Sequence, residues 1–131
     1  MGLFIAERIR KREFGKEIPS VDKVTLLECA VISLAEAISG KGLPKGTRLL
    51  KSYATTKQGP KRILYLLVVT DDDLFVLFYR DKKDKIGENM SPKNPAFNAA
   101  LAKHLELLLQ DMAANRIEEI VPEPQMPAEE P

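Results

Sequence analysis

The chain has 131 residues, 44% of them hydrophobic, which predicts one domain with a core of its own. Its single cysteine, Cys29, and single histidine, His104, exclude an internal disulfide and argue against a zinc site made of these ligands. No apolar run approaches the ~18 residues that cross a bilayer, and the first residues lack the pattern of a signal peptide. We therefore expect a cytoplasmic protein.

The net charge of +1 conceals a division between two parts of the chain. Residues 1–62 hold 13 Lys and Arg against 6 Asp and Glu, whereas residues 63–131 hold 7 against 13. A basic body followed by an acidic tail is compatible with a polyanionic partner.

The first elements predicted along the chain are a strand and a helix. Leu3 to Ala6 form a short apolar run that predicts a strand, and the Arg- and Lys-rich stretch after it predicts a short helix that ends at Gly15.

A second, longer helix is predicted from Val21 to Ser39, with Ser20 or Asp22 as its cap and Gly40 as its stop. Apolar residues recur in it at spacings of three and four, which is typical of a helix that buries one stripe. The stripe consists of Val24, Leu27, Val31, Leu34 and Ile38.

Three strands are predicted next: Thr47 to Tyr53, Arg62 to Thr70, and Leu74 to Arg80. The middle strand is apolar on both faces, so we expect it in the centre of the sheet. A polar loop, residues 54–61, joins the first two strands, and the sequence TDDD at 70–73 predicts a tight hairpin between the last two.

A last helix is predicted to begin with Asn94 as its cap and Pro95 in its first turn, and Asn115 is expected to end it. Residues 116–121 form either a frayed turn or a short edge strand. The apolar stripe of the helix consists of Phe97, Leu101, Leu105, Leu108 and Met112. Residues 121–131 are rich in Pro and Glu, which predicts a disordered tail after a single domain of residues 1–120.

This order of elements predicts the α+β class, with N-terminal helices packed on an antiparallel β-meander and a helix at the C-terminal end. In such a meander, the cations at the strand ends should converge at one edge of the sheet. They are Lys57, Lys61, Arg62, Arg80 and Lys82. Converging cations repel one another, and phosphate is an obvious counter-charge for them. Tyr53, Tyr65 and Tyr79 can add stacking faces or a hydroxyl.

A plainer interpretation of the same residues remains open. Asp81 and Asp84 alternate with the lysines, so residues 80–85 also fit a self-neutralising surface loop.

Three segments resemble the RelE/ParE-type toxins of bacterial type II toxin–antitoxin systems, in particular their HigB-like members. TKQGPKRILYLL (56–67) resembles their Lys- and Gly-rich loop and the strand after it, and GLPKGTRLLKSY (42–53) resembles the segment before that loop. LFVLFYRDKKDK (74–85) resembles the last family strand, which ends in a basic cluster. The resemblance spans about residues 3–90.

The resemblance implies a small RelE-like fold with a concave, basic sheet face. It also implies an mRNA interferase, a metal-independent endoribonuclease that inhibits translation by cleaving messenger RNA, on the ribosome in many members. The 2′-hydroxyl attacks the neighbouring phosphate. The expected partners are a cognate antitoxin, messenger RNA and the ribosome, without a membrane or a cofactor. The alternative is a non-catalytic protein of the same fold, either a ParE-like gyrase inhibitor or a degenerate module that binds RNA or a protein partner.

The resemblance also assigns site residues by position. Arg62 matches the strand arginine that contacts the reacting phosphate, Arg80 or Lys82 matches the second cation, and Lys57 matches a loop lysine. These catalytic candidates would transfer protons and stabilise the charged transition state. Binding of RNA is expected of Lys51, Lys61, Lys83, Lys85 and Tyr79, and no residue is expected to bind a metal.

The sequence departs from the family at the C-terminal tyrosine, which has no clear counterpart. Tyr79 comes earlier and is expected on the opposite sheet face from Arg80, because neighbours on a strand alternate. His104 lies on the last predicted helix between Lys103 and Leu105, and it is expected to be a boundary residue rather than a base.

Overall fold

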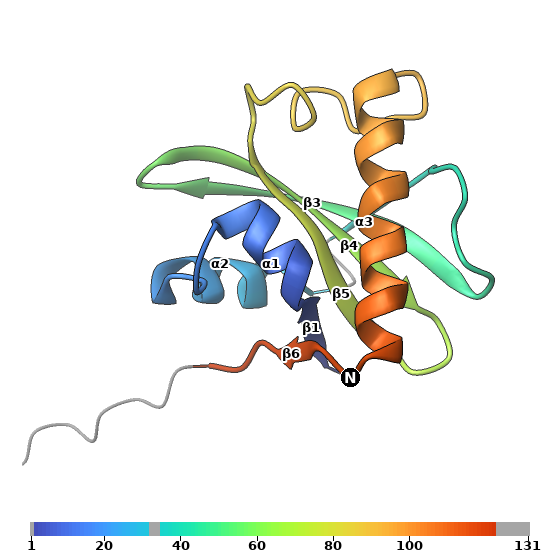
Figure 1. Ribbon diagram of the computed structural model, residues 1–131. Helices are drawn as coiled ribbons and strands as arrows, with labels where there is room; N and C mark the ends of the chain where they lie inside the picture. Colours follow the sequence, from blue (N-terminus) through green and yellow to red (C-terminus); the bar gives the residue numbers. More distant parts are fainter. Residues whose placement is uncertain (1, 32–34, 123–131) are drawn as a thin grey trace, which may run out of the picture.

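The computed structural model describes residues 2–31 and 35–122, and within them the chain folds into three helices and six strands around one core (Figure 1). The elements follow in the order β1 (Leu3–Ala6), α1 (Glu7–Phe14), α2 (Ser20–Cys29), β2 (Glu36–Ile38), β3 (Thr47–Thr56), β4 (Gly59–Val68), β5 (Asp73–Asp81), α3 (Pro95–Ala113) and β6 (Ile117–Glu119). The α+β class is therefore confirmed.

The six strands form a single sheet with the order β2-β3-β4-β5-β1-β6. The meander β3-β4-β5 lies at its centre, and β1 pairs in parallel with β5, while every other pair is antiparallel. The predicted strands at 3–6, 47–53, 62–70 and 74–80 all occur, and β4 is internal as its apolar sequence indicates.

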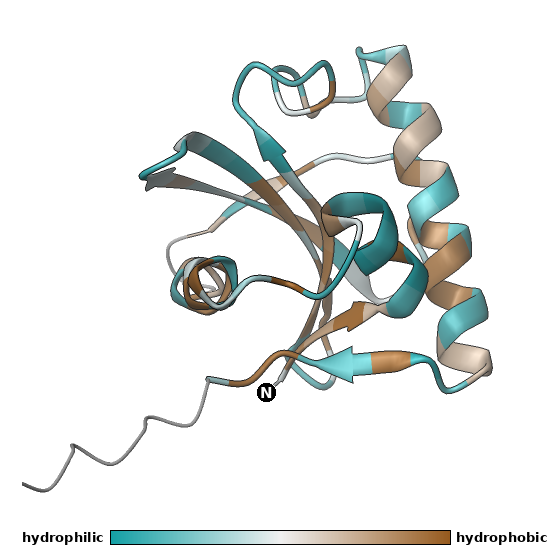
Figure 2. Cartoon of the chain, turned by 60° about the vertical axis from the view of Figure 1, so that its left-hand side comes forward, coloured by the Kyte–Doolittle hydropathy of each residue, from teal (hydrophilic) through white to brown (hydrophobic). Residues whose placement is uncertain are grey.

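Helices cover both faces of the sheet (Figure 2). On one face α3 packs through Phe97, whose ring centroid lies 6.1 Å from that of Phe78 on β5. On the other face α2 packs against β4, where the hydroxyl of Tyr65 donates to the carbonyl of Leu26 at 2.8 Å. The first helix, α1, follows β1 directly and packs against β1, β5 and α3. In the part of the chain that the structure describes, no helix is long and apolar enough to cross a membrane.

Two helix boundaries agree with the signals in the sequence. Gly15 ends α1 with a φ of 78°, a conformation that glycine adopts without steric cost. The side chain of Asn94 accepts from the amide of Ala96 at the start of α3, and Pro95 follows it.

The prediction of a helix from Val21 to Ser39 is wrong beyond Cys29, because α2 stops there and residues 36–38 form β2. Leu26 is the only fully buried residue of α2, and Val24 and Val31 are 48% and 44% exposed, so the expected stripe is not the buried one. Leu34 lies outside the described residues. The physical reason is that β3 offers an open edge, with which β2 pairs.

The predicted caps of α2 and the predicted stop at Gly40 are also wrong. Pro19 occupies the N-cap position in place of Ser20 or Asp22, both of which lie within the helix. Gly40 follows β2, where a Cβ would lie 2.3 Å from Leu49, so this glycine allows close packing rather than a helix end.

The polar loop predicted at 54–61 is wrong as well, because β3 and β4 continue through it to a turn at residues 57–58. The hydroxyl of Thr56 donates to the carbonyl of Gly59 across this turn, and Gly59 has a φ of 111°. Cross-strand hydrogen bonds satisfy the backbone here, so the strands need no apolar side chains to extend.

Two predictions for the end of α3 and the residues after it are confirmed, and a third is wrong. Asn115 has a φ of 57° after the helix end, and residues 117–119 form the edge strand β6 rather than a frayed turn. Met112, expected in the buried stripe, is 45% exposed. Of the tail predicted at 121–131, residues 123–131 lie outside the described residues.

Candidate nucleic-acid interface

The predicted cations lie at one end of the sheet, but the strand register divides them between its two faces. Arg62 of β4 lies directly opposite Arg80 of β5, and Lys61 lies opposite Asp81. Side chains alternate along a strand, so Arg62 and Arg80 belong to the face that α3 covers. Lys61 belongs to the face of α2, so the predicted cations do not share one face, although Lys61 and Arg80 line the same cleft at the end of the sheet.

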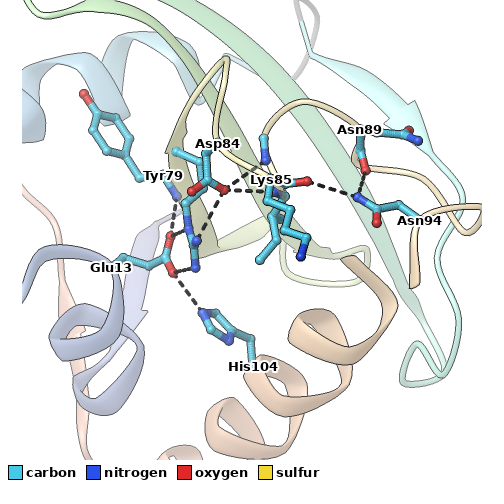
Figure 3. A network of polar contacts seen from close by, with 10 residues as sticks. Glu13, Tyr79, Asp84, Lys85, Asn89, Asn94 and His104 are labelled. Atoms are coloured by element: carbon cyan, nitrogen blue, oxygen red, sulfur yellow. Dashed lines mark hydrogen bonds and ion pairs between the residues drawn. The ribbon is translucent and has the colours of Figure 1, made fainter. Parts of the chain in front are cut away.

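Arg80 is bound by the carboxylates of Glu13 and Asp84, which are labelled in Figure 3. Its Nε and Nη2 donate to the two oxygens of Glu13 at 2.8 and 2.7 Å, and its Nη1 lies 3.4 Å from Oδ1 of Asp84. The same Glu13 carboxylate accepts from the amide of Tyr79 at 2.9 Å, at a part of β5 that lies beyond the pairs with β1. The charge of Arg80 is therefore compensated by carboxylates, although its side chain is 25% exposed and lines a cleft at the end of the sheet.

The Glu13 carboxylate is charged although it is fully buried. Burial alone would raise its pKa, but hydrogen bonds from His104, Arg80 and the Tyr79 amide hold the pKa of Glu13 below its ordinary value. The hydrogen bond to Glu13 correspondingly raises the pKa of Arg80.

His104 completes this network from α3, and it is a fully buried residue rather than the expected boundary residue. The ring is fully buried, with Nε2 3.1 Å from Glu13 and the ring stacked on Phe78 at 4.5 Å between centroids. A signal for this was present in the sequence, because His104 follows Phe97 by seven residues, two helical turns. Asp111 lies another seven residues along α3 and is also buried. Its carboxylate accepts from Nε of Arg8, so it also joins α3 to α1.

The loop after β5 carries three exposed lysines, Lys82, Lys83 and Lys85. Asp84 fixes the loop, since its Oδ1 accepts from the amides of Ile86 and Gly87 at 2.9 and 3.2 Å. Farther along, Asn94 donates to the carbonyls of Lys85 and Asn89, as Figure 3 shows. These hydrogen bonds fix the backbone of the loop, which keeps the three lysines at the surface.

On the α2 face, Lys61 forms an ion pair with Asp81 and lies 5.6 Å above the ring of Tyr79. The hydroxyl of Tyr79 donates to Asp22 of α2 at 2.8 Å, and burial raises the pKa of this phenol. These groups line a cleft of about 380 Å³ between the helices and the end of the sheet. As expected, Tyr79 and Arg80 point to different faces of the sheet. The hydroxyl of Tyr79 binds Asp22, and the guanidinium of Arg80 binds Glu13.

On the α3 face lie two partly exposed cations, Lys51 and Arg62, both near the ring of Tyr53. We call these three residues the open cluster. The guanidinium carbon of Arg62 lies 4.1 Å from the ring centroid of Tyr53, and Nζ of Lys51 lies 5.3 Å from it. Tyr53 is 50% exposed. Among the described residues, no carboxylate forms an ion pair with Arg62 or Lys51, although Glu36 lies opposite Lys51 on β2.

Lys57 lies apart from the open cluster, at the exposed turn between β3 and β4. It is four residues beyond Tyr53, or ~13 Å along an extended strand. A bound nucleic acid would have to span more than one nucleotide to meet both Lys57 and Arg62.

The open cluster is suited to binding a phosphodiester chain. It combines accessible cations with an aromatic face on a paired, rigid strand, which is the combination used for single-stranded nucleic acids. Comparisons of the chain with models of known families, with curated proteins and with solved structures find no match.

Proposed function

We propose that this protein is the toxin of a type II toxin–antitoxin module with a RelE-like fold, which binds messenger RNA at the open cluster and cleaves it without a metal. The observation that carries the proposal is Arg62, which β4 presents on the sheet face with Tyr53 as its neighbour and with no ion pair to any carboxylate of residues 2–31 and 35–122. In this proposal the protein acts in the cytoplasm, on ribosome-bound RNA, and a cognate antitoxin restrains it.

In the proposed reaction, the 2′-hydroxyl attacks the adjacent phosphorus, and the 5′-oxygen of the next nucleotide leaves. Arg62 binds the phosphate oxygens, where negative charge develops in the transition state. Lys82, which is exposed, is the candidate for proton transfer, and Lys57, at the distant turn, would bind a neighbouring phosphate of the same chain. Arg80 has a different role from the one that its position in the sequence indicates: it holds the loop that carries Lys82.

The alternative is a binding protein of the same fold that does not cleave RNA, such as an inhibitor of DNA gyrase. One observation favours it: Arg80 and the hydroxyl of Tyr79, two groups with catalytic potential, are both bound by carboxylates.

Induced expression in a bacterium separates the two functions. We expect the wild type to stop translation and to leave cleaved messenger RNA, and Arg62→Ala to lose both effects. Arg48→Ala is the matched control, because Arg48 is exposed on the same strand as Tyr53 but alternates to the opposite face. Normal translation with intact messenger RNA in the wild type would contradict the nuclease, and growth arrest with altered DNA supercoiling would support the gyrase alternative.

A further inference from the structure

The three tyrosines of the chain have very different access to solvent. Tyr65 is fully buried, and Tyr79 is only 8% exposed with its ring stacked on Phe14 at 5.3 Å between centroids. Tyr53 is 50% exposed. The tyrosine with a ring available to a ligand is therefore Tyr53, a choice that the sequence alone leaves open.

Tyr53 lies two residues beyond the last described pair between β2 and β3, Glu36 with Lys51. The carbonyl of Tyr53 accepts from Sγ of Cys29 at 3.8 Å, so α2 contacts the backbone here, while the Tyr53 side chain belongs to the opposite, α3 face. On its other side, Tyr53 is paired with Arg62, and β3 continues for three more residues as part of a ten-residue strand. The ring is thus carried by a strand that is paired with β4, and it remains half exposed.

The two cations beside the ring define what kind of ligand fits. A bare aromatic ligand would use Tyr53 but not the charges of Arg62 and Lys51, and inorganic phosphate would use the charges but not the ring. A nucleotide within a chain uses both, because its base stacks while the phosphates on either side bind the cations.

We propose that Tyr53 is a stacking platform for one unpaired base of single-stranded RNA, with the flanking phosphates bound by Arg62 and Lys51. This inference rests on the proposed function and names the form of RNA that the site takes. A duplex is a poor ligand, since its base faces are covered by their neighbours in the stack.

Fluorescence anisotropy with three labelled ligands of equal phosphate number tests the proposal: a single-stranded RNA, an oligomer without bases, and an RNA duplex. We expect the wild type to prefer the single-stranded RNA. Tyr53→Leu should lose roughly tenfold in affinity for this RNA and nothing for the oligomer without bases, as is typical when one stacked base is lost. Tyr53→Phe, which keeps the ring, should bind like the wild type.

The proposal is overturned if Tyr53→Leu keeps the wild-type preference for bases, or if the duplex binds as tightly as the single strand. Circular dichroism establishes that the leucine variant is folded. If it is not, the comparison of RNA with and without bases on the wild type and Tyr53→Phe decides, and equal affinities overturn the proposal.

The test separates this inference from the proposed function. Base-dependent binding by a wild type that leaves translation intact would refute the nuclease and retain the stacking platform. Translation arrest by a wild type whose RNA affinity does not depend on Tyr53 would do the reverse. A wild type that binds none of the three ligands would contradict both.

Discussion

Arg62 and Arg80 lie directly opposite one another on β4 and β5, yet they have different roles. Arg80 turns to the buried carboxylate of Glu13, which is 67 residues away in the sequence. Arg62 turns the other way and lies over the exposed ring of Tyr53. Like charges that face each other across a sheet destabilise it. Each arginine therefore interacts with a group on the side away from the other arginine: Arg80 with Glu13, and Arg62 with Tyr53. The position of an arginine at a strand end therefore does not reveal whether its side chain stabilises the fold or is available to a ligand.

The buried network around Arg80 joins three elements that the sequence separates. Glu13 belongs to α1, Arg80 to β5 and His104 to α3, and the Glu13 carboxylate receives hydrogen bonds from both of the others. The open cluster around Tyr53, in contrast, involves only the neighbouring strands β3 and β4. We therefore expect the network to determine stability and the open cluster to determine binding.

The largest effect is expected for Glu13→Gln, which keeps an oxygen for the Tyr79 amide but removes the charge that compensates Arg80. Removing one partner of a buried ion pair costs ~3–5 kcal/mol, and because the Arg80 side chain is 25% exposed, we expect about 3 kcal/mol or slightly less. The measurement is the free energy of unfolding in urea at neutral pH.

The matched control for this variant is Arg62→Gln, which changes the charge of the facing arginine instead. Its effect on stability should stay within ~0.5 kcal/mol, as is usual for surface substitutions. Equal losses for the two variants would show that the open cluster is as structural as the buried network.

A smaller effect is expected from acid. The pKa values of Glu13, Asp84 and Asp111 lie below their ordinary values of 4.5, 3.8 and 3.8 in the folded protein. Depressed carboxyl pKa values contribute stability above the unfolded pKa, and this contribution is lost as the pH falls through the folded pKa. The free energy of unfolding should therefore be nearly constant from neutral pH to about pH 5 and decline below pH ~4.5.

Glu13→Gln tests how much Glu13 contributes to the acid sensitivity, because this variant lacks one of the three titrating carboxylates. Its decline in stability below pH ~4.5 should be shallower than that of the wild type. Curves of the same slope would mean that Glu13 does not contribute to the acid sensitivity.

The smallest effect is expected for Asp81→Asn on the opposite face of the sheet. Asp81 pairs with Lys61, but its side chain is 65% exposed, so solvent screens the pair. Such pairs contribute ~0–1 kcal/mol, and we expect a loss below 0.5 kcal/mol in urea unfolding. A loss comparable to that of Glu13→Gln would indicate that the α2 face depends on its ion pairs as much as the α3 face does.

Local signals in the sequence predicted those parts of the fold that local chemistry decides. The cap at Asn94 and the turn at Gly15 depend on the conformational preferences of single residues, and β4 follows from an uninterrupted apolar run. The helix expected to continue past Cys29 failed because its apolar periodicity competed with pairing to β3, an interaction between residues distant in the sequence. Similarly, the polar residues 54–61 extend a hairpin through backbone hydrogen bonds, which side-chain patterns do not reveal.

For the candidate site, sequence patterns alone predicted which cations lie at the strand ends and that Tyr79 and Arg80 diverge, because alternation along a strand needs no further information. The patterns did not predict that Glu13 binds both Arg80 and His104, or that Tyr53 is half exposed with Arg62 over its ring. These contacts depend on the tertiary structure, because a charged side chain pairs with the groups that the packed helices place within about 3 Å of it. Those neighbours come from α1 and α3, whose positions depend on how the whole core packs.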